Sequence, residues 1–199
     1  MKTMPRSYTL KRRAEKQADT RRRIVEAAVD LHGTVGPGLT TLSMIAERAG
    51  VQRHTLYAHF PDERSLYLAC SALHMEREPM PDPEPWRAIA DPAERLRTGL
   101  QALYGWYGRN ATLAGCVLRD AEYHPLTREI AQMRLGPVMA AYGAILGSGL
   151  AAAQRPMLHL ALSFYTWRNL VQEAGLAEAA AAEAMTRAVA GAEVLRTGG

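Results

Sequence analysis

The feature that most limits how this chain can fold is a sharp break between two short helical segments within residues 39–60, LTTLSMIAERAGVQRHTLYAHF. The first segment follows Thr40 and Thr41, whose hydroxyl groups can cap a helix, and it ends at Gly50, where a left-handed backbone costs least. The second segment begins about two residues later and runs to about residue 59. The side chains expected to fill the interior between them are Ile45, Ala46, Val51 and Leu56. This pattern predicts a helix-turn-helix.

The second of these helices has a polar outer face with net positive charge, and a helix of this size fits the major groove of DNA. Arg53 is the best reader of guanine on that face, because arginine makes the commonest specific contact with this base. A short helical hairpin buried in a core is the alternative, but polar groups beside Arg53 argue against it. The residues expected to face outward, toward bases or phosphates, are Gln52, Arg53, His54, Thr55, Tyr57 and His59.

The charge of the chain is concentrated at one end. The formal net charge is +4, yet residues 1–23 hold nine basic and two acidic side chains, so the remaining residues carry a net negative charge. A basic end is typical of proteins with a polyanionic partner. A solvated, disordered tail explains the same run of charge equally well.

The rest of the sequence favours an all-α fold, because alanine is abundant and no segment alternates apolar and polar residues. Four prolines in residues 78–85 interrupt the helical pattern. We expect a basic flexible arm (1–19), a three-helix DNA-binding domain (20–77), a proline-rich linker (78–90) and a C-terminal helical domain (91–199). The helices of this C-terminal domain are expected near 91–109, 111–123, 126–146, 156–174 and 176–196. The first helix of the chain is expected at about 20–32, in the DNA-binding domain.

The C-terminal region collects aromatic and polar residues among apolar helices, as small-molecule sites do. Simple core packing is the better explanation for any one of them. As a set they suggest a cavity for an aromatic or amphipathic ligand, and the candidate residues are Trp106, Tyr107, Tyr123, Phe164, Trp167 and Arg168. The last two helices are expected to form a homodimer interface through a stripe of Leu176, Ala180, Ala184, Ala188 and Leu195.

Other functions find little support in the sequence. It contains no nucleophile elbow, zinc-protease motif, P-loop or dinucleotide fingerprint, so we expect no catalytic residues, no cofactor and no enzyme activity. Asp120 and His124 stand at i and i+4, but two ligands are weak support for a metal site, and none is expected. Two cysteines, no signal peptide and no clear membrane span favour a cytoplasmic protein without a membrane partner.

Three segments within residues 20–70 resemble the N-terminal domain of the TetR family of bacterial transcriptional regulators. They read TRRRIVEAAVDLHGTVG, TTLSMIAERAGV and TLYAHFPDERSLYLA. The resemblance implies an all-helical homodimer with a DNA-binding headpiece and a larger C-terminal domain that binds an inducer. It also implies that Thr41 and the start of the fourth helix contact the DNA backbone. There the family often has a lysine where this chain has Glu63, so Arg64 is the expected substitute. Gln52 likewise replaces a usual Ser or Thr cap.

These observations predict a ligand-responsive repressor that binds a palindromic operator in double-stranded DNA and is released by a small molecule. A ligand-independent or activating DNA-binding protein is the alternative. A helical enzyme is the contrasting class, with less support.

Overall fold

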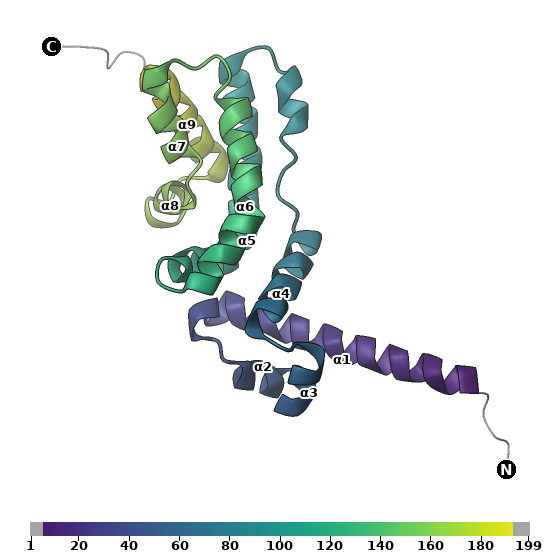
Figure 1. Ribbon diagram of the computed structural model, residues 1–199. Helices are drawn as coiled ribbons and strands as arrows, with labels where there is room; N and C mark the ends of the chain where they lie inside the picture. The colour runs from purple at the N-terminus through teal and green to yellow at the C-terminus, as the bar shows by residue number, and fades with distance from the viewer. Residues whose placement is uncertain (1–5, 193–199) are drawn as a thin grey trace. The chain divides into compact units, whose positions relative to one another are not determined.

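The computed structural model describes the backbone of residues 6–192 and the side chains from Leu10 onward. In that part of the chain every regular element is a helix, which confirms the all-α prediction (Figure 1). The α-helices are α1 (Arg6–Thr34), α2 (Leu42–Arg48), α3 (Arg53–His59), α4 (Glu63–Arg77), α5 (Pro92–Ala121), α6 (Pro125–Leu146), α7 (Arg155–Ala161), α8 (Phe164–Arg168) and α9 (Glu178–Gly191). The short turns between them are η1 (Pro37–Leu39), η2 (Glu84–Ala88), η3 (Ala152–Gln154) and the π-helical η4 (Asn169–Glu173).

The chain forms two compact units. Unit 1 contains the residues up to 77 together with 116–130, and unit 2 contains 78–115 and the residues from 131 onward. The segment 116–130, which the sequence assigned to the C-terminal domain, therefore packs with the N-terminal helices. Residues 1–5 of the predicted arm and the end of the predicted helix 176–196 lie outside the described residues.

One face of α1 organises the core of unit 1. Ile24, Ala28 and Leu66 are fully shielded from solvent, and α1 packs against α2, α3 and α4. The other buried members of this core include Ile45, Ala46, Leu56, Phe60 and Cys70. The apolar residues predicted for the interior of the helix-turn-helix are therefore buried or partly buried. Ile45, Ala46 and Leu56 lie on the inner faces of α2 and α3, and Val51 lies in the turn between these helices.

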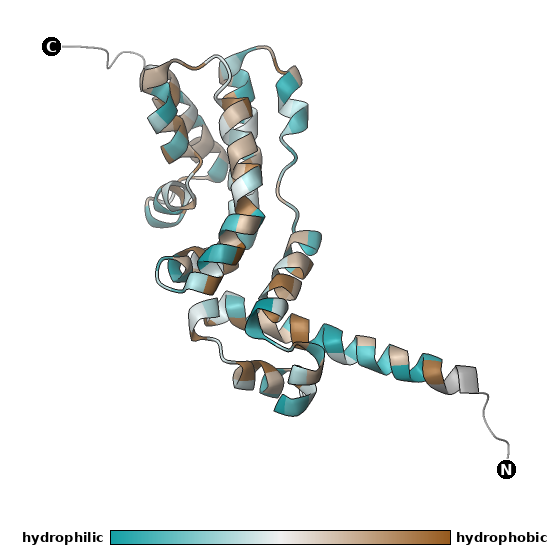
Figure 2. Ribbon diagram, viewed as in Figure 1, coloured by the Kyte–Doolittle hydropathy of each residue, from teal (hydrophilic) through white to brown (hydrophobic). Residues whose placement is uncertain are grey.

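Helix α1 begins at Arg6, so the start predicted at Thr20 was too late. Residues 10–19 contain helix-forming Lys, Arg, Ala, Glu and Gln and no Gly or Pro, and a formed helix extends at little further cost. Asp19 adds ion pairs to Arg22 at 2.8 Å and to Arg23 at 3.4 Å along the helix. Figure 1 shows this half of α1 running past the other helices of unit 1, and Figure 2 shows that it is mostly hydrophilic.

Helix α5 is continuous over Pro92–Ala121, so the predicted division at residue 110 was wrong. Asn110 does not interrupt the helix, because its buried side-chain amide donates to the backbone carbonyl of Trp106 at 2.9 Å. Gly99 allows α5 and α6 to approach closely in unit 2. A Cβ added at this position would lie 2.6 Å from the side chain of Leu146.

The predicted helix 156–174 is divided into α7, α8 and the turn η4. The break follows Leu162, and Ser163 caps α8 by accepting from the backbone N–H of Tyr165 at 3.2 Å. Two hydroxyl groups of α5 bind buried carbonyl groups at the end of α7. Tyr104 donates to the carbonyl of Ala161 at 2.9 Å, and Tyr107 donates to that of Leu162 at 2.8 Å.

The proline-rich segment is fastened to unit 2. Trp86 in η2 is buried, and its ring lies 5.2 Å from that of Tyr142 on α6. The Tyr142 hydroxyl donates to the carbonyl of Pro81 at 2.6 Å. Trp106 donates from its indole nitrogen to the carbonyl of Glu78 at 3.1 Å. Through these contacts, residues 78–90 pack against α5 and α6 and do not form a free linker.

Helix α9 closes the core of unit 2 with a face of small and medium side chains, Ala181, Ala182, Met185 and Val189. The buried Gln154 side chain donates to the carbonyls of Val189 and Ala190, each at 3.2 Å, and so ties η3 to α9. No helix among the described residues combines the length and the hydropathy needed to cross a bilayer.

Candidate nucleic-acid interface

Helices α2 and α3 form the predicted helix-turn-helix in unit 1. Thr41 caps α2, where its hydroxyl accepts from the backbone N–H of Met44 at 3.2 Å. Gly50 has φ +65°, the left-handed conformation expected after the first helix. The N–H of Val51 returns to the carbonyl of Ala46 at 2.9 Å, which closes the turn. Local sequence therefore fixes the angle at which α3 leaves α2.

Helix α3 buries one side chain and exposes most of the others. Leu56 is 1% exposed and anchors the helix in the core. Gln52, Arg53, His54 and Tyr57 are exposed, whereas Thr55 and His59 are half-buried. The Arg53 guanidinium donates to the Tyr57 hydroxyl at 3.4 Å, one turn further along. The outer face of α3 thus carries hydrogen-bonding groups held in a defined row.

Gln52 occupies the N-cap position of α3 but makes no capping bond with its side chain. A Ser or Thr here would use its hydroxyl group on the helix itself. The Gln52 amide instead carries two donors and an acceptor at the exposed end of α3, where the first backbone N–H groups of the helix also lie.

Two residues that are predicted to contact the DNA backbone already have hydrogen-bond partners within unit 1. Thr41 uses an acceptor lone pair in its cap, and its O–H donor still suits a phosphate. Arg64 on α4 is bonded to Glu129 on α6, with nitrogen–oxygen distances of 2.7 and 2.9 Å. Because both side chains of this pair are more than half exposed, exchanging Glu129 for a phosphate costs little.

The buried carboxylate of Asp120 supports the segment in front of α2, a role that the sequence did not predict. Asp120 is fully shielded and accepts from the backbone N–H of Gly38 at 2.8 Å, from Arg119 at 2.7 Å and from the Tyr123 hydroxyl at 2.6 Å. Burial alone would raise the pKa of Asp120, but these hydrogen bonds outweigh it and hold the pKa below its usual value.

Asp120 and His124 each have other hydrogen-bond partners within unit 1. The Nδ1 atom of His124 lies 2.7 Å from the Thr127 hydroxyl. Among the described residues no three His, Cys, Asp or Glu side chains group in a way that would hold a metal ion. The i, i+4 spacing was visible in the sequence, but the partner at Gly38 is 82 positions away and gave no local signal.

A second buried polar group lies under α4. His32 on α1 is 4% exposed, its ring lies 4.7 Å from that of Tyr67, and its Nδ1 is 3.5 Å from the Cys70 sulfur. Burial lowers the pKa of His32 to about 4, against the opposing effect of Asp120. This histidine is therefore neutral inside unit 1 at physiological pH.

The predicted ligand residues are divided between the two units. Tyr123 lies in unit 1, is 56% exposed and is bonded to Asp120. In unit 2 the rings of Trp106, Tyr107, Phe164 and Trp167 pack together, with neighbouring centroids 5.3–6.0 Å apart. We call these four residues the aromatic cluster. Arg168 lies beside it, over the ring of Tyr165.

The aromatic cluster is buried, and one of its polar atoms lacks a partner. Each of the four side chains is at most 5% exposed. The Tyr107 hydroxyl is bonded to α7, and burial raises its pKa. The indole nitrogen of Trp167 has no hydrogen-bond acceptor among the residues that the structure describes. A buried donor without an acceptor is unusual and favours a ligand or water at that point.

Comparison with known proteins agrees with this geometry. Residues 24–70 match the family model described as "Bacterial regulatory proteins, tetR family". Over 59 residues the chain is 41% identical to an uncharacterized HTH-type transcriptional regulator of Mycobacterium tuberculosis. That alignment covers 30% of this chain, and the chain spans only 31% of the length of the relative.

Solved structures match over most of the chain. A TetR-like transcriptional regulator from Rhodococcus sp. RHA1 superposes with a TM-score of 0.64 over 89% of this chain and 97% of its own, at 18% identity. Another transcriptional regulator from Rhodococcus gives a TM-score of 0.58 at 17% identity, covering 85% of this chain and 95% of the other. At such identities the likeness concerns the fold. Residues 24–70 therefore match the tetR family of bacterial regulatory proteins, and the chain as a whole shares its fold with a TetR-like regulator.

Proposed function

We propose that this protein binds a palindromic DNA operator as a homodimer, represses transcription there, and leaves the operator when a small molecule binds unit 2. The observation that carries the proposal is the outer face of α3. Leu56 anchors the helix, while Arg53 and Tyr57 stay exposed in one row. A helix fixed on one side and hydrogen-bonding on the other is suited to reading a major groove.

Base recognition is assigned to Arg53, whose guanidinium suits the O6 and N7 atoms of guanine. Its contact with the Tyr57 hydroxyl limits its rotamers before DNA is bound, so less entropy is lost on binding. Gln52, His54, Thr55 and His59 flank it on α3, and Thr41 and Arg64 approach the phosphates from the neighbouring helices.

A two-fold dimer is proposed because one recognition helix reads too few base pairs for specificity. Helix α9 buries one face within its own unit, but Ala180 is exposed and Ala184 and Ala188 are half-buried. These small side chains would allow a second copy of α9 to approach closely. Leu195, the last residue of the predicted stripe, lies outside the described residues.

The aromatic cluster supports a ligand site for an aromatic or amphipathic molecule. The unpartnered indole N–H of Trp167 favours a ligand that carries a hydrogen-bond acceptor. Arg168 would add a charged donor beside the cluster. Tyr123, which lies in unit 1, is not retained as a member of this site.

Helix α5 offers a route by which the ligand would affect DNA binding. It carries Trp106 and Tyr107 of the aromatic cluster and, further along the same helix, Asp120. Asp120 binds the Gly38 N–H in front of α2. A ligand that binds better to a shifted position of α5 would therefore favour a second arrangement of the helix-turn-helix.

The proposal is tested by selecting bound sequences from random double-stranded DNA with the wild-type protein. We expect a palindrome whose half-sites are about one helical turn of DNA apart. Asymmetric or unrelated sequences would contradict the proposed dimeric mode of binding. A reporter gene carrying the operator then separates repression from activation.

The ligand is tested with a panel of aromatic and amphipathic molecules. A molecule that binds only the folded state raises the melting temperature, and the same molecule should weaken operator binding. Compounds that do the first without the second would favour a ligand-independent DNA-binding protein. We place this regulator in the cytoplasm, where its DNA is found.

A further inference from the structure

The exposed half of α1 has an unusual character for a helix in a folded protein. Leu10 is 62% exposed, and residues 11–19 are exposed throughout. Residues 10–23 contain seven basic and two acidic side chains. This part of the helix thus has no apolar face for a partner helix or for a bilayer. Its charge suits a polyanion.

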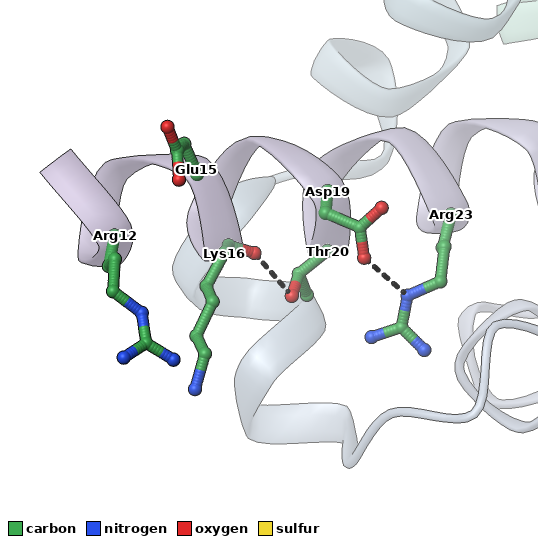
Figure 3. A pocket seen from close by; sticks show the side chains of 6 residues that line it. All are labelled: Arg12, Glu15, Lys16, Asp19, Thr20 and Arg23. Carbon is green, nitrogen blue, oxygen red and sulfur yellow. Dashed lines mark hydrogen bonds and ion pairs between the residues drawn. The ribbon is translucent and has the colours of Figure 1, made fainter.

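The basic side chains are ordered along one face. Arg12, Lys16 and Arg23 are spaced at i, i+4 and i+11, which places them within about 40° of one another around a helix. They line a surface pocket together with Glu15, Asp19 and Thr20. In Figure 3 Arg12, Lys16, Thr20 and Arg23 extend to one side of α1, whereas Glu15 points to the other side. We call Arg12, Lys16 and Arg23 the α1 stripe.

The inner end of the α1 stripe is joined to the helix-turn-helix. Arg23 donates from Nη1 to the carbonyl of Ala49 at 3.2 Å, next to the Gly50 turn. On the opposite side of α1, about 160° around the helix from Arg23, the Arg21 guanidinium lies 4.7 Å from the centre of the Phe60 ring at the end of α3. The stripe therefore starts at the α2–α3 turn and continues outward along α1.

We propose that the α1 stripe is a second DNA-binding surface, which binds phosphates flanking the base pairs read by α3. The proposal rests on the proposed function of α3. From Arg12 to Arg23 the stripe is about 16 Å long, close to half a turn of B-DNA. Phosphate contacts of this kind carry no sequence information but add affinity and fix the orientation of the protein.

Two double variants test the stripe with the same loss of charge. Arg12→Ala with Lys16→Ala removes one Arg and one Lys from the stripe. Lys11→Ala with Arg13→Ala removes one Lys and one Arg about 100° to either side of Arg12. All four residues are exposed, and alanine favours helix, so both variants should keep α1 intact, as circular dichroism can verify.

The measurement is the affinity for the selected operator as a function of salt. Each phosphate contact contributes about 0.9 to the slope of log K against log salt concentration. We expect the stripe variant to reduce the slope by about 1.8 for each protomer, or about 3.6 for the proposed dimer, equally for operator and unrelated DNA. The control variant should leave the slope close to that of the wild type. Trimming the base pairs that flank the operator should reduce the wild-type slope but not that of the stripe variant.

The outcomes separate the two proposals. If the stripe and control variants reduce the slope equally, the charge acts without a defined surface and the α1 stripe is overturned, while operator binding stands. If the wild type selects no DNA sequence at all, the function proposed for α3 fails. An unchanged wild-type slope on trimmed DNA would also overturn the stripe.

Discussion

Gly36 and Gly50 both have backbone conformations that favour glycine, but their surroundings differ. Gly50 has φ +65°, and a Cβ there would have its nearest neighbour 3.8 Å away, at the Arg23 guanidinium. Gly36 has φ +104°, and a Cβ there would overlap the side chains of Arg119 and Asp120. Gly50 is therefore required by its backbone conformation alone. Gly36 is required by its backbone conformation and by the side chains of Arg119 and Asp120, which pack against it in front of α2.

This difference predicts unequal effects on stability. Gly50→Ala should lower the free energy of unfolding by about 1–2 kcal/mol, the cost of a left-handed alanine. Gly36→Ala should cost about 3 kcal/mol or more, because steric overlap adds to the strained backbone. Urea unfolding monitored by circular dichroism measures both values. Equal losses would show that Asp120 yields to the added methyl group without cost.

His32 predicts a loss of stability in mild acid. Its pKa of about 4 in the folded protein lies below the value of about 6.5 for an unfolded histidine. The unfolded chain therefore binds more protons between these values, and stability falls as the pH decreases from about 6.5 to 4. The full contribution of His32 to the free energy of unfolding, about 3 kcal/mol, is present above pH 6.5.

The control is His32→Leu, which removes the titrating ring from the same buried position. Its free energy of unfolding should change less between pH 6.5 and 4.5 than that of the wild type. Carboxylates with lowered pKa values, such as Asp120, affect stability in more acidic solution. Their contribution to the free energy of unfolding decreases only near and below the ordinary pKa of a carboxyl group. An identical acid profile for wild type and variant would refute the role given to His32.

At the scale of single elements, α3 gives the most direct prediction. Arg53→Ala should cost about 1–3 kcal/mol of binding at the best operator and relax specificity at one position in each half-site. Competition binding against operators changed at single positions measures both effects. Arg77→Ala at the end of α4 removes the same charge from a pair with Glu26 and should leave specificity unchanged.

The opposite pattern would change the assignment of Arg53. If Arg53→Ala weakened binding to all sequences by the same factor, Arg53 would be a phosphate contact. Base reading would then pass to its neighbours on the outer face of α3, Gln52 and Tyr57.

The elements also show why some predictions succeeded. The helix-turn-helix was predictable because its determinants are local: the Thr41 cap, the Gly50 turn and the buried Leu56 lie within sixteen residues of sequence. The break after Leu162 was not, because the hydroxyl groups of Tyr104 and Tyr107 that satisfy its carbonyls come from α5. The contact of Asp120 with the Gly38 N–H was not predictable for the same reason, since the two residues are distant in sequence.

At the scale of the whole molecule, the outer side of α9 predicts assembly. Ala188 is half-buried beside a face that is already packed in unit 2. Ala188→Glu should leave the fold intact but place a charge in the proposed dimer interface, so both the dimer and operator binding should be lost at micromolar concentration. Sedimentation velocity and operator binding measure the two losses.

Ala179→Glu, on an exposed part of α9 away from the stripe, is the matched control and should remain dimeric. A wild-type protein that sediments as a stable monomer, yet binds a palindrome tightly, would disprove this interface. Melting temperatures of the two variants show whether any loss reflects unfolding instead.

Unit 1 is built from two separate stretches of the chain, because residues 116–130 return to it after the first part of unit 2. A chain cut after residue 77 would therefore lack Asp120 and leave the Gly38 N–H without its buried acceptor. The same holds for exchange between relatives. A chimera that receives a new N-terminal region by one crossover keeps the old residue 120. Recombination that transfers the proposed DNA specificity therefore needs a second crossover after residue 130, or residues at positions 38 and 120 that already fit each other.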